Sequence, residues 1–190
     1  LFFLLTISLF LLSCDRENIS VKPAHTGSAG EIIVICPDSI WNNGLDSSMT
    51  NLFRFYLPML PQPEEAFTVG HYTPEQFTMI IERHRNIFII KTDNTRPENQ
   101  ASYNLYKDKW AKSQIVLEIE AKTTTEAIAK LEEHQAELVD IINRKENERI
   151  AGIFSTYPAK GAMSMVKKKF DVDLVFPKGF EVSKNEDDFM

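Results

Sequence analysis

The chain has 190 residues, of which 43% are hydrophobic and 25% are charged, which is the composition of a globular protein with one good-sized core. Its net charge of −6, without a clustered basic stripe, argues against nucleic acid as a partner. The basic run Lys167–Lys169 is interpreted as the last turn of a helix, where the helix dipole favours cations. The alternative is a small patch that binds phosphate or lipid headgroups.

The first segment, Leu1–Leu12, is apolar apart from two hydroxyl residues, and it predicts the hydrophobic region of a secretory signal peptide. It is shorter than the ~20 residues that a helix needs to span a bilayer. It closes on Leu11-Leu12-Ser13-Cys14, which resembles a bacterial lipobox. We therefore expect residues 1–13 to be a lipoprotein signal peptide and Cys14 to carry diacylglycerol and an acyl chain such as palmitate. Each buried methylene of such an anchor contributes about 0.8 kcal/mol.

Residues 14–30 are polar and contain Pro23, Gly27 and Ser28, a composition typical of a flexible tether. Anchor and tether together predict a membrane-anchored lipoprotein of the cell envelope, facing the periplasm or the cell surface. The choice between inner and outer membrane stays open. Asp15 after the cysteine acts as a retention signal in some bacteria, whereas acidic residues such as Asp15 and Glu17 act as an export signal in others.

The first predicted strand is the β-branched run of residues 31–36, which Pro37 ends. A helix follows and stops before Pro58, because its apolar residues are spaced by three and four: Met49, Leu52, Phe53 and Tyr56. Residues 66–72 predict a second strand. Thr73-Pro74-Glu75-Gln76 then predicts a helix start with a capping box, followed by an apolar face of Phe77, Ile80 and Ile81.

A third strand is predicted over residues 87–90, a loop over 93–104 and a fourth strand over 114–120. The longest predicted helix covers residues 123–150, with an apolar stripe that we expect to lie across the sheet: Ile128, Leu131, Leu138 and Ile142. Another helix follows Pro158, and residues 171–182 predict a last, interrupted strand.

This mixture predicts an α+β, or α/β, two-layer sandwich in which helices pack on a mixed sheet. A doubly wound sheet is less favoured, because the second strand and the tail of the chain are rich in proline. We expect one α+β domain over residues 31–170 and the incomplete start of a second unit over 171–190. Phe180-Glu181-Val182 echoes Phe67-Thr68-Val69, which suggests a partial repeat, although coincidence in a chain with 13 phenylalanines is the alternative.

Four short segments carry a family resemblance: residues 30–35, Trp41, residues 60–64 and residues 84–87. Their order and spacing are similar to those of the domain-of-unknown-function family DUF4837, whose members are uncharacterised bacterial envelope lipoproteins. The resemblance covers roughly residues 30–190 and includes no chemically diagnostic motif. It implies an envelope location and a fold class, and it brings no activity, cofactor or catalytic residue.

Cys36 follows the first strand and His71 ends the second, at positions where α/β proteins often build ligand sites. A Cys–His pair can form a thiolate nucleophile, so an envelope hydrolase or transferase that uses Cys36 with His71 is one hypothesis. The alternative is an inert, buried cysteine, which has no disulfide partner in the chain if Cys14 is lipidated. The sequence contains no Gly-rich phosphate loop, serine elbow or zinc-type cysteine pair, and we expect neither metal nor cofactor.

The other histidines have structural interpretations: His25 is expected to be solvated in the tether, His84 with Arg85 to end a helix, and His134 to lie on a solvated helix face. Large aromatic residues near loops are the remaining candidates. Most should lie in the core, but a subset can line a groove for a peptide or glycan: Trp41, Tyr56, Phe67, Tyr72, Tyr103, Tyr106 and Trp110.

The favoured hypothesis for function is therefore a non-enzymatic, lipid-anchored envelope protein that binds another protein or an envelope polymer. The anchor, the tether, the acidic surface and the lack of a recognisable catalytic motif support it. The hydrolase or transferase described above is the alternative.

Overall fold

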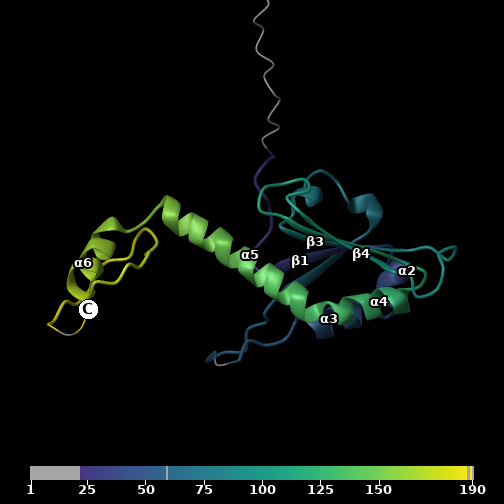
Figure 1. Cartoon of the computed structure of the whole chain (residues 1–190), viewed down its shortest axis with the longest axis horizontal. Coiled ribbons are helices and arrows are strands. Elements are labelled where there is room, and N and C mark those ends of the chain that lie inside the picture. Colours follow the sequence, from purple (N-terminus) through teal and green to yellow (C-terminus); the bar gives the residue numbers. More distant parts are fainter. Residues whose placement is uncertain (1–21, 59, 188, 190) are drawn as a thin grey trace, which may run out of the picture.

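The computed structural model describes residues 22–190 apart from 59, 188 and 190 (Figure 1). The expected signal peptide and lipidation site, Cys14, lie outside the described residues. Among the described residues, none of the helices is both long enough and apolar enough to span a membrane.

A five-stranded mixed sheet forms the centre of the fold, with the strand order β2-β1-β3-β5-β4. The strands β2, β1, β3 and β5 run parallel, and β4 pairs antiparallel with β5 at one edge. The central strands are almost continuously apolar because both of their faces are covered. The bounds are β1 Glu31–Ile35, β2 Thr68–Tyr72, β3 Asn86–Thr92, β4 Ser102–Lys107 and β5 Ile115–Ala121.

Helices cover one face of this sheet and enclose the main core (Figure 1). They are α2 (Asp38–Ile40), a short π-helical turn η2 (Trp41–Leu45), α3 (Asp46–Phe53), α4 (Thr124–Glu133) and the first half of α5 (Gln135–Thr156). Leu131, Leu138 and Ile142 of the expected apolar stripe are fully buried, and Ile128 packs beside them. The predicted fold class, α+β with helices packed on a mixed sheet, is confirmed.

The opposite face of the sheet is covered less completely. In the described part of the chain, its apolar residues pack against the segment that contains the two 3-10 turns η3 (Pro74–Gln76) and η4 (Ile81–Arg83), and against the loop that carries Trp110. The predicted helix after Thr73 was wrong beyond its first turn. The capping box forms as expected, but Phe77 leaves the helical conformation with ψ 80°, and Ile80 is 72% exposed. Of the residues expected on one apolar helix face, Phe77 and Ile81 therefore pack on the sheet, whereas Ile80 faces solvent.

Strand β4 and the long helix also differ from expectation. Strand β4 was missed because it is a half-exposed edge strand whose sequence mixes aromatic and polar residues. The long helix is interrupted at His134, whose ring stacks on Tyr103 at 3.9 Å, while the Gln135 side chain donates to the Leu52 carbonyl at 2.8 Å. These two contacts hold the break between α4 and α5.

The C-terminal part extends away from the sheet, with α5 running past the sheet edge and α6 (Lys160–Phe170) beyond it (Figure 1). The basic run Lys167–Lys169 forms the last turn of α6, as expected. Residues 171–182 make only an isolated bridge, Pro158 with Pro177, so the last predicted strand was wrong. Phe67 is fully buried whereas Phe180 is 57% exposed, so the sequence echo between them is not a structural repeat.

The last part of the expected tether is bound to the domain. The Lys112 amide donates to the Pro23 carbonyl at 2.8 Å, and Thr26 exchanges backbone hydrogen bonds with Arg83 and Arg85 at 2.9 and 3.0 Å. The residues preceding β1 therefore form hydrogen bonds with backbone groups of two loops, and these groups would otherwise lack partners.

Candidate functional site

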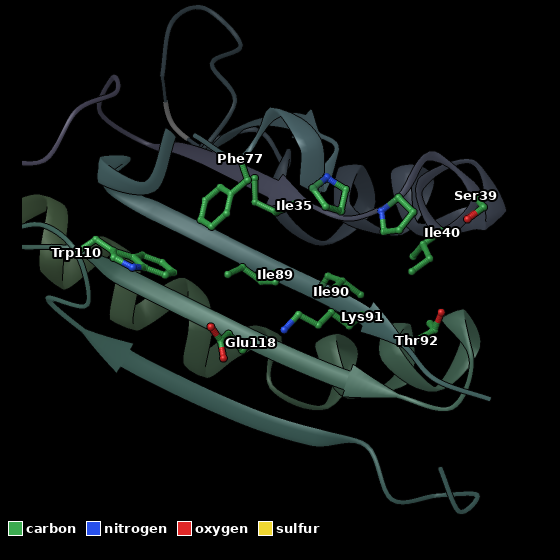
Figure 2. A pocket seen from close by; sticks show the side chains of 12 residues that line it. Ile35, Ser39, Ile40, Phe77, Ile89, Ile90, Lys91, Thr92, Trp110 and Glu118 are labelled. Carbon is green, nitrogen blue, oxygen red and sulfur yellow. The ribbon is translucent and has the colours of Figure 1, made fainter. Parts of the chain in front are cut away.

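The sheet contains one topological switch point, between β1 and β3. The chain proceeds from β1 outward to β2, then crosses back to β3 and continues toward β5 on the other side. In open sheets of parallel strands, ligands bind near the carboxyl ends of the strands at such a reversal. A groove of about 590 Å³ lies here, on the thinly covered face of the sheet (Figure 2).

The groove has an apolar floor and aromatic walls. Ile35 of β1 and Ile89 of β3 form the floor, and Phe77 meets Trp110 edge to face with a centroid distance of 5.5 Å (Figure 2). Pro37, Ile40 and Pro74, which follow the ends of β1 and β2, complete the apolar side. The groove persists because the two short 3-10 turns cannot cover the face as a full helix would.

Polar side chains line the opposite side of the groove. Lys91 of β3 and Glu118 of β5 both face it (Figure 2). Glu118 forms an ion pair with Lys109, whose ammonium also lies 4.6 Å above the Trp110 ring. Lys91 lies 3.6 Å from Glu120. A ligand in this groove therefore meets apolar surface on one side and charged groups on the other.

Sequence reasoning did not locate this site. Trp110 was among the candidate aromatics, but Phe77 was assigned to a helix face, and Lys91 and Glu118 were not considered. The available signal was the prolines directly after two parallel strands, which indicate loops at the carboxyl edge of the sheet.

The structure brings Cys36 and His71 close together, but not as a catalytic pair. Cys36 is 1% exposed, and burial raises the pKa of its thiol to about 12. The His71 Nε2 atom lies 2.9 Å from the Cys36 carbonyl oxygen, and the His71 ring stacks on Trp41 at 4.5 Å. Since a thiolate is the reactive species, this arrangement does not favour nucleophilic catalysis.

His84 ends a helix as expected, although this helix is only the 3-10 turn η4, and its side chain and that of Arg85 bind carboxylates rather than only the end of the helix. They lie at the start of β3, at the amino edge of the sheet, where His84 Nε2 is 2.9 Å from Glu31 Oε2 and Arg85 is 2.6 Å from Glu146 Oε2. Arg149 of α5 donates to Glu146 Oε1 at 2.7 Å and is itself buried. This polar cluster attaches α5 to the sheet and lies at the edge opposite the carboxyl-end groove.

His25 is part of the same region and is half-buried, so the prediction of a fully solvated side chain in the tether was wrong. Its Nδ1 atom is buried, and among the described residues no side chain or backbone group forms a hydrogen bond with it. Burial and the positive charges of Arg149 and Arg85 lower the pKa of His25. The segment before β1 thus places a half-buried imidazole in the electrostatic field of two arginines.

The other aromatic candidates do not join the groove. Phe67 is in the core, Trp41 stacks on His71, and Tyr103 stacks on His134, which is therefore packed against a strand rather than fully solvated. Tyr56 is exposed. Within the described part of the chain, no group of three His, Cys, Asp or Glu side chains is placed to hold a metal ion.

The fold and the groove define an α+β domain with a ligand-sized site on one face of its sheet. A family model, Domain of unknown function (DUF8532), matches residues 25–155, which is more than half of the chain, and the chain belongs to this family. The matched residues include the whole sheet and every residue that lines the groove.

The expected resemblance to DUF4837 was wrong, since the family that matches is a different one. The segments that suggested it are common strand and turn patterns without a specific chemical group, so their order did not discriminate between families. No curated protein and no solved structure matches the chain.

Proposed function

We propose that this protein is a non-enzymatic binding module of the cell envelope, which takes an apolar group of its ligand into the groove between Phe77 and Trp110. The groove itself is the observation that carries the proposal. Its volume of about 590 Å³ lies within the range of about 300–1,000 Å³ that is typical of small-molecule sites. Its floor and one wall are apolar, and a few polar groups are grouped on the other side.

The energetics favour an apolar occupant. Each methylene group that leaves water contributes about 0.8 kcal/mol. Aromatic walls also provide large contact areas at little cost in side-chain entropy. The Phe77 and Trp110 rings already pack against each other and against the sheet, so the site is largely formed before a ligand arrives.

The envelope location rests on the sequence alone. Residues 1–13 followed by Cys14 support a lipoprotein signal peptide and lipidation, and the polar residues that follow support a tether. A lipid-anchored domain would present its groove to molecules at a membrane surface. The buried Cys36 thiol supports a binding role over cysteine catalysis.

The test uses Nile red, a neutral fluorescent probe for apolar sites. We expect saturable binding to the folded protein, at least tenfold weaker in Phe77→Ala and in Ile89→Thr, because each change removes apolar contact in the groove. Tyr56→Ala is the matched control, since Tyr56 is an exposed aromatic outside the groove. Equal binding by all four proteins, with their thermal unfolding unchanged, would exclude the groove as the site.

A further inference from the structure

The carboxylates on and beside the charged side of the groove are shared unequally. Glu118, which lines the groove, forms an ion pair with Lys109, whereas Glu120, next on the same face of β5, is shared by Lys91 and Arg96. Lys91 therefore has no carboxylate to itself in this set of side chains.

Lys91 is the cation with the weakest pairing. Lys109 contacts Glu118 directly, and Arg96 lies 3.2 Å from a Glu120 oxygen. The Lys91 ammonium lies 3.6 Å from the other Glu120 oxygen, which is too far for a hydrogen bond. The Lys91 side chain is 59% exposed, yet it lines the groove. An incoming anion can therefore reach Lys91 without breaking a strong ion pair.

The apolar floor and this cation lie in line. Ile89 and Lys91 are two residues apart on β3, so their side chains lie on the same face of the sheet and are separated by about 7 Å. Figure 2 shows Phe77 and Trp110 on the Ile89 side of this pair, with Lys91 next along the strand. A ligand lying along β3 would thus place one end between aromatic rings and the other at an ammonium group.

We infer that the ligand of the groove is an amphipathic anion: an apolar chain or ring that lies on Ile35 and Ile89 against Phe77 and Trp110, with a carboxylate or phosphate at Lys91. This inference rests on the proposed function and names its ligand class. The Glu118 carboxylate also lines the groove, but its charge is compensated by Lys109. Both a free fatty acid and the headgroup end of a lipid have this chemistry.

The experiment compares amphipathic probes of opposite charge, of which the fatty acid and the cation have single chains of matched length. Trp41→Phe leaves Trp110 as the single tryptophan, so its fluorescence reports on the groove. Decanoate, decyltrimethylammonium and dihexanoyl phosphatidic acid are titrated below their micelle-forming concentrations. Decanoate stands for a free fatty acid and the phosphatidic acid for a lipid. We expect at least one of the two anions to bind about twofold to fivefold more tightly than the cation, as one ion pair at a half-exposed site provides.

Variants then assign the preference to Lys91. Lys91→Gln should remove it and Lys91→Glu should reverse it, and the wild-type preference should shrink at high salt because the pair is solvent-accessible. Lys130→Gln is the matched control, since Lys130 pairs with Glu133 on α4, in the helical layer. The inference is overturned if the three probes bind alike or if Lys91→Glu keeps the preference for anions. If Phe77→Ala loses all binding but the Lys91 variants have no effect, the inferred ligand class is wrong while the groove remains the binding site. The proposed function itself fails if Phe77→Ala binds every probe as well as the wild type does.

Discussion

Arg149 of α5 donates from its Nη1 atom to the side-chain oxygen of Asn86 at 3.3 Å, across the amino edge of the sheet. The two residues are far apart in the sequence, and both are buried. Arg149 also donates to the backbone carbonyls of Arg85 and Ser113, so a single guanidinium closes the gap between two strand starts and the helix. This interaction fixes how α5 leaves the domain.

Replacing Arg149 should destabilise the domain strongly. In Arg149→Ala, the Ser113 carbonyl and the Asn86 side-chain oxygen lose the Arg149 donor, and the Arg85 carbonyl keeps only the Ile115 amide. Glu146 keeps Arg85 as its ionic partner. Breaking a buried ion pair in this way typically costs about 3–5 kcal/mol. Urea unfolding measures the change, and Arg144→Ala is the control, because Arg144 makes an exposed pair with Asp140 and should cost less than about 1 kcal/mol. A similar loss in both variants would contradict the assignment of the cluster as the attachment of α5.

Stability should fall as the pH drops below neutrality, because of His25. Burial and the nearby arginines lower its pKa below the ordinary value of 6.5, so the unfolded chain binds a proton more readily than the folded one. Well above pH 6.5 the imidazole is neutral in both states and has no effect. As the pH falls through 6.5 the unfolded state gains protons first, so the free energy of unfolding decreases until the folded state is protonated as well.

Urea unfolding of the wild type and His25→Asn at pH 7.5 and pH 5.5 measures this effect. The variant should lose less stability than the wild type between the two pH values. Glu31 does not obscure the comparison: its pKa is lowered below 4.5, so its stabilising contribution is lost only at more acidic pH. Parallel pH profiles for the two proteins would show that the pKa of His25 is the same in the folded and unfolded chains.

The Cys36 thiol should be unreactive in the folded protein. It is buried, and its pKa of about 12 leaves almost no thiolate at pH 8. In a Cys14→Ser chain, iodoacetamide should label Cys36 only after denaturation, while an added exposed thiol in Ser47→Cys reacts at once. Rapid labelling of native Cys36 would revive the thiolate hypothesis that the sequence suggested.

The elements that depend on a local sequence pattern could be predicted from the sequence. The β-branched run of β1 and the Leu131–Leu138–Ile142 stripe are periodic over short windows, and both lie where expected. The capping box at Thr73 was also correct, but it determines only one turn. Whether a helix continues depends on the surface it covers, and no local signal shows that Phe77 must turn toward Trp110.

The candidate groove and the buried polar cluster were unpredictable for the same physical reason. Each joins residues that are distant in the chain: Phe77 with Trp110 in the groove, and His25 with Arg149 in the cluster. Composition does not show which of the many aromatic and charged residues of the chain meet in this way. Only the crossing of the chain at the β1–β3 switch point brings Phe77 and Trp110 to one face.

Membrane attachment should depend on one sulfur atom. If the lipobox is recognised, Cys14 carries a diacylglycerol thioether and becomes the acylated amino terminus of the mature protein. Two or three acyl chains, each methylene contributing about 0.8 kcal/mol, hold a protein at a membrane far longer than one chain does.

In cells that process bacterial lipoproteins, the wild type should fractionate with membranes, resist extraction with high salt and incorporate a clickable palmitate analogue. Cys14→Ser should lose the label and leave the membrane fraction, whereas Cys36→Ser should behave like the wild type. Full retention of Cys14→Ser on membranes after a salt wash, with no label in any variant, would remove the anchor from the proposed function.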